Sequence, residues 1–333
     1  MIELDFKSLE NIDHIARAVN CLPSFIHQVL ERTSLFYNIK KIPKKGKRQK
    51  GQYRIIYEVE LELNIIQKNI STAITSKQQF HEYVQGFVSK RSIATNASLH
   101  LSKKYVLNLD IKNFFDSITQ KQVSDVFKEL GCTERSAEIF TKLCTLNGHL
   151  VQGASTSPVL ANLVCKELDQ DFARLAQQYN CSYSRYADDI TFSGDLTPGK
   201  KDIEKCLNKY EFELNPAKWK HQRRGRSQYV TGLTVFDNTK PRIPKFIKKQ
   251  LRQILYYASK YGWDNHESKV NSCNHKNMHY EIKRINGLIA FMYSVEPERA
   301  LQFDLQWQKI IKEGLLDENQ RDPHAIFARH SRV

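Results

Sequence analysis

Apolar residues recur at helical spacing near both ends of the chain. Near the start, this spacing predicts a helical segment over residues 12–31, marked by Ile15, Val19, Phe25, Val29 and Leu30. Past residue 236 the pattern is helical throughout. It predicts three helices there, over approximately 244–261, 277–294 and 297–314.

The middle of the chain alternates strand and helix patterns. A β-hairpin is predicted around the basic stretch 40–54, leading through YRIIYEV into a helix near 60–75. YVLNLDI (105–111) is a continuous apolar strand that carries Asp110 at its end, and SYSRYADDITFSG (182–194) predicts a second hairpin. The pattern therefore predicts an α/β (α+β) body followed by a helical bundle.

Three further helices are predicted, two between these strands and one after them. Val123, Val126, Phe127 and Leu130 mark the first, with Gly131 just past its end. The second begins with Ser157 as N-cap and Pro158 at its first position. Its single apolar stripe comprises Leu160, Leu163, Val164, Leu168, Phe172 and Leu175. Thr197-Pro198 starts the third, which continues to Tyr210.

An apolar content of 41% indicates an ordinary globular protein. Because 333 residues are more than a single hydrophobic core usually accommodates, we expect two or three subdomains. No apolar run approaches the roughly 18 residues that a membrane span needs. The polar, acidic start MIELDFKSLENIDH excludes a secretory signal, so we expect a cytoplasmic protein.

The seven cysteines are scattered without a CxxC pair, which predicts free thiols. One segment, CNHKNMH, could bind zinc through Cys273, His275 and His279, with His266 nearby. A complete ligand set at standard spacing is missing, so a polar loop is the favoured interpretation.

The formal net charge of +15 is the compositional feature that says most about binding partners. Lysine and arginine crowd into three runs, KKIPKKGKRQKGQYR (40–54), KWKHQRRGR (218–226) and PRIPKFIKKQLR (241–252). Any one of these runs could be a solvated face. Three of them in one chain indicate a polyanionic partner, and nucleic acid is the favoured one.

Two adjacent carboxylates, Asp188 and Asp189, stand at the expected turn of the second hairpin. Like charges that share a site are costly, and a divalent cation would reverse that cost. Asp110 ends another buried strand, and carboxylates from neighbouring strands can hold two magnesium ions about 4 Å apart for displacement at phosphorus. Asp-Asp is also common in plain turns; the strand-ending Asp110 and the basic surface favour phosphoryl transfer.

The order of motifs resembles a known family. LDIKNFF, QGASTSP, RYADD and ELNPAK resemble the palm of reverse transcriptases, in sequence and spacing, over residues 40–236. NASLH (Asn96, Ala97, His100) and VTG (Val230, Thr231, Gly232) are similar to elements of bacterial retron reverse transcriptases, within the group II intron-like superfamily.

The resemblance implies a right-hand polymerase fold, with a small antiparallel sheet in fingers and palm and an all-helical thumb. It divides the chain into an N-terminal helical segment (1–39), fingers (40–104), a palm with the catalytic site and some inserted fingers elements (105–236), and a thumb or RNA-binding region (237–333). The chain departs from the family at Ser155 and Val59, where proline is frequent, and this affects loop rigidity more than chemistry.

Site residues follow from the same resemblance, position by position. Asp110 and Asp188 would be the main ligands of two Mg²⁺ ions, with Asp189 supporting the second and the Ile111 carbonyl adding a ligand. The residues that the family places at the nucleotide are Arg54 at the triphosphate, Phe115 against the sugar, Gln152 and Gly153 beside nucleotide and template, and Lys218 near the pyrophosphate.

RNA recognition is assigned to two regions. Asn96, His100 and the VTG element would recognise the RNA fold. The thumb would supply a basic surface comprising Lys245, Lys248, Lys249 and Arg252, with Tyr256 and Tyr257 nearby for stacking.

The resemblance implies a retron enzyme that copies a structured noncoding RNA from the 2′-hydroxyl of a guanosine, giving branched RNA-linked single-stranded DNA. Such enzymes serve in phage defence with an effector, which would be a separate chain here because only ~100 residues follow the palm. Three alternatives stay open: a group II intron or diversity-generating reverse transcriptase, a catalytically idle RNA-binding scaffold, and a metal-dependent nuclease.

Overall fold

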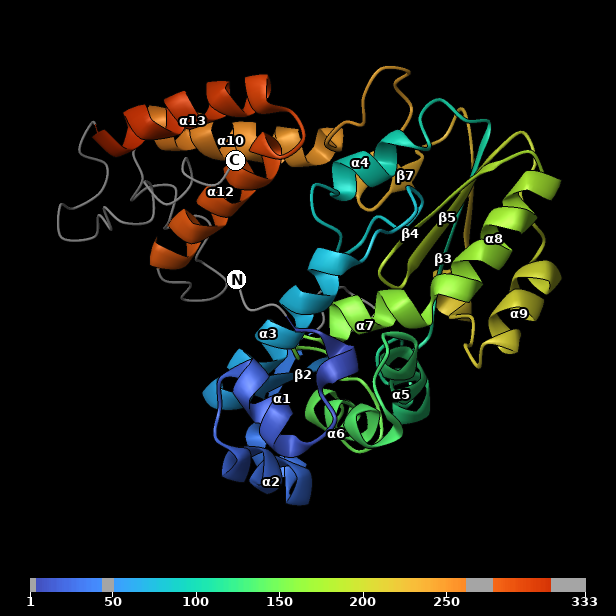
Figure 1. Cartoon of the computed structure of the whole chain (residues 1–333). Coiled ribbons are helices and arrows are strands. Elements are labelled where there is room, and N and C mark those ends of the chain that lie inside the picture. Colours follow the sequence, from blue (N-terminus) through green and yellow to red (C-terminus); the bar gives the residue numbers. More distant parts are fainter. Residues whose placement is uncertain (1–3, 44–50, 262–277, 313–333) are drawn as a thin grey trace. The chain divides into compact units, whose positions relative to one another are not determined.

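The computed structural model describes residues 4–43, 51–261 and 278–312, and divides the chain into two compact units, Met1–Thr231 and Gly232–Val333 (Figure 1). This division lies close to the predicted end of the palm at residue 236. The zinc candidate around Cys273 and His275 lies outside the described residues. Among the described residues, no helix is both long enough and apolar enough to cross a membrane.

The first unit begins with the helical segment predicted over 12–31. It consists of two helices, α1 (Ile12–Val19) and α2 (Pro23–Glu31), because Asn20 adopts a left-handed φ of 59° and ends α1. A short 3-10 turn (Phe6–Ser8) precedes them and another (Thr33–Phe36) follows. Helix α6 (Glu134–Cys144), which the apolar pattern did not predict, packs against both α1 and α2.

The predicted first hairpin is present as β1 (Tyr37–Pro43) and β2 (Tyr53–Val59), followed by α3 (Leu61–Lys77). Its antiparallel register runs from Tyr37 opposite Val59 to Pro43 opposite Tyr53. The base of the hairpin is buried, because Tyr37 and Val59 both belong to the core, whereas its outer part is exposed.

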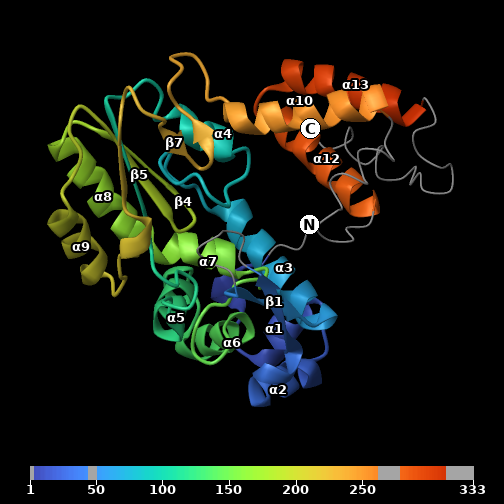
Figure 2. The same ribbon diagram turned by 180° about the vertical axis from the view of Figure 1, so that it is seen from behind.

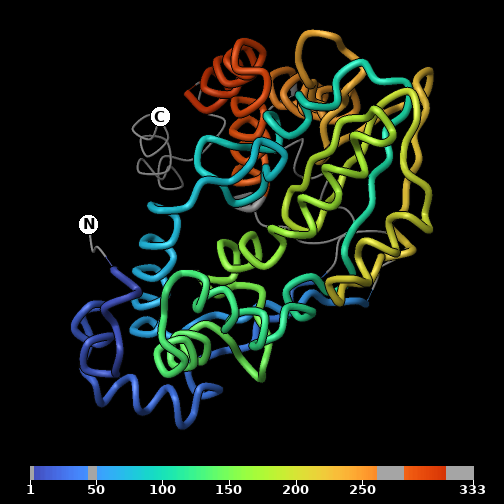
Figure 3. The backbone as a smooth tube through the Cα atoms, turned by 45° about the vertical axis from the view of Figure 1, so that its right-hand side comes forward, coloured from blue at the N-terminus to red at the C-terminus, as the bar shows by residue number. Residues whose placement is uncertain are grey.

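The first unit contains a four-stranded antiparallel sheet, and Figure 3 follows its backbone. Its order is β4 (Ser182–Tyr186), β5 (Asp189–Gly194), β3 (Tyr105–Asp110) and β6 (Lys220–Arg223). Side chains alternate along it as a pleated sheet requires. One face pairs the buried Leu107 with Phe192 and Leu109 with Ile190. The other face carries Val106 together with polar residues such as Asn108 and Thr191.

Helices cover the apolar side of this sheet (Figure 2). Phe172 of α8 (Lys166–Gln178) packs edge-on against Phe192 of β5, and α9 (Lys200–Lys209) packs against α8. Helices α5 (Gln120–Glu129), α7 (Ser157–Val164) and α4 (Ile93–Ser98) complete the unit, with the short strand β7 (Tyr229–Val230) beside α4.

Two predicted helix starts were wrong in detail. Thr156, not Ser157, is the N-cap of α7, and the predicted single stripe is divided between α7 and α8 at Cys165, which flanks both helices. Helix α9 begins after Gly199 rather than at Thr197-Pro198, because the Asp202 carboxylate accepts from the Gly199 amide and so caps the helix there.

The second unit contains β8 (Leu233–Thr234) and the helices α10 (Lys245–Tyr261), α12 (Met278–Tyr293) and α13 (Pro297–Lys312). These helices occupy the three segments predicted from the apolar pattern. The fully buried Trp307 of α13 donates through Nε1 to the Asn286 side chain of α12 at 2.9 Å. Helices α10 and α13 also pack together.

Candidate active site

Three aspartates gather at one end of the sheet. Asp110 ends β3 directly opposite Asp189, the first residue of β5, and Asp188 occupies the turn between β4 and β5. The Ile111 amide donates to the Asp188 carbonyl at 3.1 Å, which ties this turn to the end of β3. The side chain of Asn215 donates to Asp110 at 2.9 Å and fixes that carboxyl group.

Crowding of these carboxyl groups changes their acidity. Burial, together with the neighbouring Asp188, raises the pKa of Asp110 to about 6, although hydrogen bonds from Lys218 and Asn215 oppose the rise. Burial, followed by the charge of Asp188, likewise raises the pKa of Asp189 to about 6. The site therefore stores electrostatic repulsion that a cation would relieve.

A cation of the chain itself already approaches two of the carboxylates. Lys218, at the end of the 3-10 turn Pro216–Lys218 that precedes β6, forms an ion pair with Asp110, and its Nζ lies 3.8 Å from an Asp188 oxygen. These contacts raise the pKa of Lys218 despite the opposing effect of burial.

The oxygen donors of this site can be compared with those that magnesium prefers. In the part of the chain that the structure describes, no three His, Cys, Asp or Glu side chains are close enough to hold a metal ion as they stand. Asp110 and Asp188 nevertheless both reach one positive centre, the Lys218 ammonium. Magnesium binds through one or two carboxylates together with substrate phosphates, so the donors fit this ion once Lys218 moves aside.

The predicted nucleotide residues Gln152 and Gly153 lie in the loop before α7, against the first hairpin. The Tyr57 amide of β2 donates to the Gln152 carbonyl at 2.8 Å. Gly153 has a φ of +117°, and a Cβ there would come within 2.2 Å of the Tyr57 carbonyl oxygen. Only glycine permits this close approach. Ser155, where the family often has proline, is instead fixed by a 2.6 Å hydrogen bond to Asn64.

Phe115 follows β3 and is half-buried. Its ring lies 5.3 Å from that of the buried Phe114 and 6.3 Å from that of Phe87, centroid to centroid. Arg54 is exposed on β2, opposite Ile42, and shares a strand face with Ile56. A Cβ on Gly153 would meet the Ile56 methyl at 3.0 Å, so this face adjoins the Gln152 loop.

The residues predicted to recognise RNA through NASLH and VTG are largely internal. His100 is fully buried between the hydroxyl groups of Ser184 and Ser193, each 2.7 Å from a ring nitrogen, and burial lowers its pKa to about 3. Asn96 is buried and accepts from Ser184 at 2.6 Å. His100 and Asn96 therefore join α4 to β4 and β5, and the prediction that they contact RNA was wrong.

The VTG element is internal at its first two residues and exposed at its third. Val230 is fully buried, and the Thr231 hydroxyl donates to the Ile93 carbonyl at 3.1 Å, so both serve the packing of α4. Gly232 is exposed, with a φ of +83°.

The basic surface of α10 is smaller than predicted. Lys245, Lys249 and Arg252 are exposed, and so are Tyr256 and Tyr257. Lys248 is buried, and its Nζ lies 2.9 Å from a Glu296 carboxylate oxygen, so its inclusion in that surface was wrong.

Sequence reasoning did not single out the residues that support the catalytic turn. Arg185, Asp169, Asn162 and Gly86 surround it, and Asn215 anchors Asp110. A signal existed for Arg185, because an arginine inside a strand that is otherwise buried requires an internal partner. Nothing in the local pattern identified Gly86 or Asn162.

Comparison with known proteins agrees with these motifs. The profile of the family described as "Reverse transcriptase (RNA-dependent DNA polymerase)" matches residues 42–280. The retron Mx65 reverse transcriptase of Myxococcus xanthus is 32% identical over 297 residues, covering 83% of this chain and 65% of the relative. The retron Ec83 reverse transcriptase of Escherichia coli is 26% identical over 292 residues, covering 83% and 88%.

A further relative, the retron Ec73 reverse transcriptase of Escherichia coli, is 31% identical over 234 residues, which cover 64% of this chain and 74% of the relative. Coverage of the relatives varies. The chain spans 65% of the length of the Mx65 protein and 60% of that of the retron Mx162 reverse transcriptase of Myxococcus xanthus.

Proposed function

The chain belongs to the reverse transcriptase (RNA-dependent DNA polymerase) family, and on that premise we propose that it is the RNA-directed DNA polymerase of a retron. The observation that carries the proposal is the meeting of Asp110, Asp188 and Asp189 at one end of the sheet, with Lys218 bridging two of them. This is the charge arrangement that nucleotidyl transfer needs.

The carboxylates would hold two magnesium ions, with the Ile111 carbonyl as a further ligand. The ions, when bound, lower the pKa of an attacking ribose hydroxyl and stabilise the departing pyrophosphate. Asp110 and Asp188 would be the main ligands and Asp189 an additional one. Lys218, once released from Asp110, is placed to donate a hydrogen bond or a proton to the pyrophosphate.

The remaining nucleotide residues would bind and select the substrate. Phe115 would exclude a 2′-hydroxyl by contact with the sugar. Gln152 and Gly153 would lie beside the incoming nucleotide and the template, and Arg54 would bind the triphosphate through its guanidinium fork. The contact of β2 with the Gln152 loop supports this grouping, because it brings the two segments together.

The subdomains of the polymerase would follow one another along the chain, with fingers at 40–104, palm at 105–236 and thumb at 237–333. The exposed Lys245, Lys249 and Arg252 of α10 would contact the phosphate backbone of the cognate RNA or of the product duplex.

The similarity to retron proteins supports a specific product. The enzyme would start DNA synthesis from the 2′-hydroxyl of a guanosine in a structured noncoding RNA, leaving RNA and single-stranded DNA joined by a branch. We propose a role in defence against phage together with a separate effector protein.

Co-expression with the noncoding DNA that flanks its gene tests this proposal. Nucleic acid extracted from the purified protein should contain single-stranded DNA that shortens on RNase or debranching treatment. It should vanish with Asp188→Asn/Asp189→Asn. RNA that copurifies without DNA from either protein would support an idle RNA-binding scaffold instead. Unbranched DNA would favour another class of reverse transcriptase.

A further inference from the structure

We infer that Arg185 is the positioning residue of the catalytic turn: its buried guanidinium fixes the Ala187 carbonyl and thereby the place of Asp188. This inference rests on the proposed polymerase function, which makes Asp188 a metal ligand. The hydrogen bonds of the Arg185 side chain go to Asp169, Asn162 and Ala187, none of which is a catalytic carboxylate or a proposed nucleotide residue.

The turn is held in a backbone conformation that needs support. Tyr186 pairs with Asp189 in the hairpin register, so Ala187 and Asp188 form a two-residue loop. Ala187 has a φ of 57°, whereas Asp188 is not among the residues with positive φ. That combination is typical of a type II′ turn, whose first position normally takes glycine. A residue with a side chain there persists only where its surroundings fix it.

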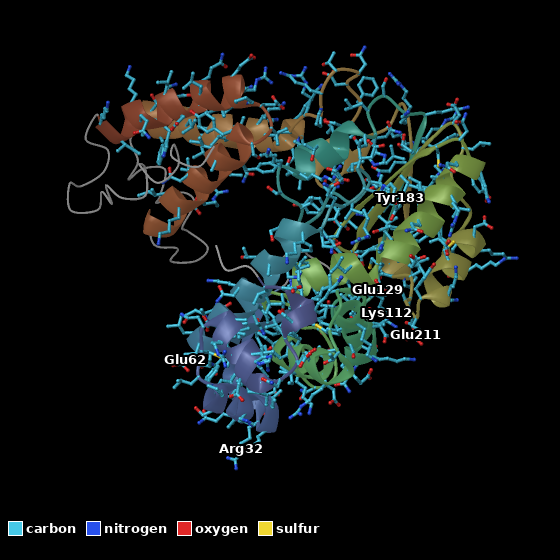
Figure 4. All side chains as sticks on the ribbon, in the orientation of Figure 1. Arg32, Glu62, Lys112, Glu129, Tyr183 and Glu211 are labelled. Carbon is cyan, nitrogen blue, oxygen red and sulfur yellow. The ribbon has the colours of Figure 1, made fainter. Side chains whose placement is uncertain are left out.

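The guanidinium of Arg185 provides this support from one side. It is fully buried and forms a bidentate pair with Asp169 of α8, from Nε at 2.7 Å and from Nη2 at 2.6 Å. Its Nη1 then donates to the Ala187 carbonyl at 3.2 Å and to the Asn162 side chain of α7 at 3.1 Å. Tyr183, labelled on β4 in Figure 4, donates to the same Asp169 at 2.6 Å.

The other side of the turn is held by the backbone of residues 83–86. The Gln85 amide donates to the Arg185 carbonyl at 2.7 Å. A Cβ on Gly86 would come within 2.4 Å of the Ala187 nitrogen, so glycine lets this segment lie directly on the turn. Asn162 joins the two sides, because its Nδ2 donates to the Gly86 carbonyl at 2.9 Å while its Oδ1 accepts from Arg185.

Burying the Arg185–Asp169 ion pair costs free energy, and this cost indicates that the pair has a role besides stability. Replacing a buried ion pair with apolar residues of similar size is often neutral or stabilising, so stability alone does not explain this pair. A carbon side chain would fill the volume of Arg185 but could not donate to Ala187. Lysine has one ammonium and cannot contact Asp169, Asn162 and the turn simultaneously in the same fork geometry.

The experiment uses the full-length protein with its RNA and compares Arg185→Lys and Arg185→Met/Asp169→Leu with the wild type. Hydrogen exchange at the Ile111 amide, which donates to Asp188, reports the position of the turn without requiring activity. The second readout is the magnesium concentration for half-maximal nucleotide incorporation. Phe140→Leu, in the aromatic core of α6, is the control for general loss of stability.

Both Arg185 variants should exchange faster at Ile111 and need about tenfold to hundredfold more magnesium, the range known for residues that orient metal ligands. Phe140→Leu should change neither. The inference would be overturned if both Arg185 variants showed the same exchange at Ile111 and the same magnesium requirement as the wild type. It would also be overturned if Phe140→Leu changed both quantities as much as the Arg185 variants do. If the wild type made no DNA on any template, the proposed function would fail, while exchange at Ile111 would still decide the role of Arg185.

Discussion

Asp110 faces Asp189 directly across the β3–β5 pair, so two carboxyl groups share one end of an antiparallel sheet. Burial and the charge of the neighbouring Asp188 raise the pKa of each to about 6, and the Lys218 ammonium relieves part of the cost at Asp110. The pair is therefore costly without a cation, which is expected of a site built to be completed by one.

The first prediction concerns the pH dependence of stability without metal. The folded chain keeps a proton on Asp110 up to a pH of about 6, whereas an ordinary aspartate releases it near 3.8. The folded state then binds more protons, so the free energy of unfolding should fall as pH rises through this window. Asp110→Asn should flatten that fall by up to about 2–3 kcal/mol. Urea unfolding in a chelator from pH 4 to 8 measures it.

The control for this experiment is Asp125→Asn, which changes an exposed carboxylate on α5. Equal pH profiles for the wild type and Asp110→Asn would show that this carboxyl group titrates normally.

The second prediction concerns Lys218. Because its ammonium occupies the position between Asp110 and Asp188, Lys218→Gln should bind magnesium more tightly. A tenfold fall in Kd would add about 1.4 kcal/mol of stabilisation at saturating magnesium. Thermal melts with and without magnesium measure this change. Lys201→Gln, which changes an exposed lysine on α9, is the control. A smaller magnesium shift in Lys218→Gln than in the wild type would mean that Lys218 assists metal binding.

The third prediction concerns sugar selection. Phe115→Ala removes a half-buried ring and should let ribonucleotides enter, lowering the preference for deoxynucleotides by on the order of tenfold to hundredfold. Single-nucleotide incorporation with matched dNTP and rNTP measures the ratio. Phe114→Leu, at the neighbouring buried ring, should lower stability and leave the ratio unchanged. An unchanged ratio in Phe115→Ala would remove this residue from the sugar site.

The fourth prediction separates close approach from backbone strain. Gly153→Ala places a Cβ against the Tyr57 carbonyl and should break the hydrogen bond from the Tyr57 amide to Gln152. Gly225→Ala also has a positive φ, of +95°, but its Cβ would meet open space. Both should lose roughly 1 kcal/mol to strain. Only Gly153→Ala should also raise the KM for dNTP, measured by steady-state extension. An equal KM in both variants would show that nucleotide binding does not depend on the contact between Gly153 and Tyr57.

The fifth prediction concerns acid sensitivity. Burial lowers the pKa of His100 to about 3, so it stays neutral in the folded chain while an unfolded histidine takes up a proton near 6.5. The unfolded state then binds more protons, and stability should fall as pH drops below about 6.5, by about 1.4 kcal/mol for each pH unit. His100→Gln should reduce this slope in chemical unfolding, and exposed His221→Gln should not. A slope unchanged by His100→Gln would show that the ring is protonated in the folded state.

Much of the fold could be predicted because apolar periodicity reports local structure directly. The strand that carries Asp110, the hairpin that carries Asp188 and the helices of the second unit all appear where the pattern placed them. The boundaries failed where backbone conformation decides them. Asn20 ends α1 by adopting a left-handed φ, and apolar spacing carries no information about that choice.

The candidate site was harder to predict in its surroundings than in its carboxylates. Adjacent like charges at a turn are visible in the sequence, but the partners of a buried polar group are fixed only by the fold. His100 and Lys248 show this limit, because each is polar and lies in a motif or a basic run, yet each is buried with a partner. Arg185 shows the converse, because it is the first residue of the RYADD motif, was given no role, and acts inside the core.

The alternation of core-facing and site-facing side chains along β3 and β5 affects which folded molecules persist in the cell. Leu107 and Leu109 meet Phe192 and Ile190 on one face, and Asp110 meets Asp189 on the other. A slip of one residue between these strands would turn the leucines out of the core at the same step that separated the carboxylates. A chain with a displaced active site is thus also an unstable chain, exposed to proteolysis, and the surviving molecules are those whose catalytic geometry is correct.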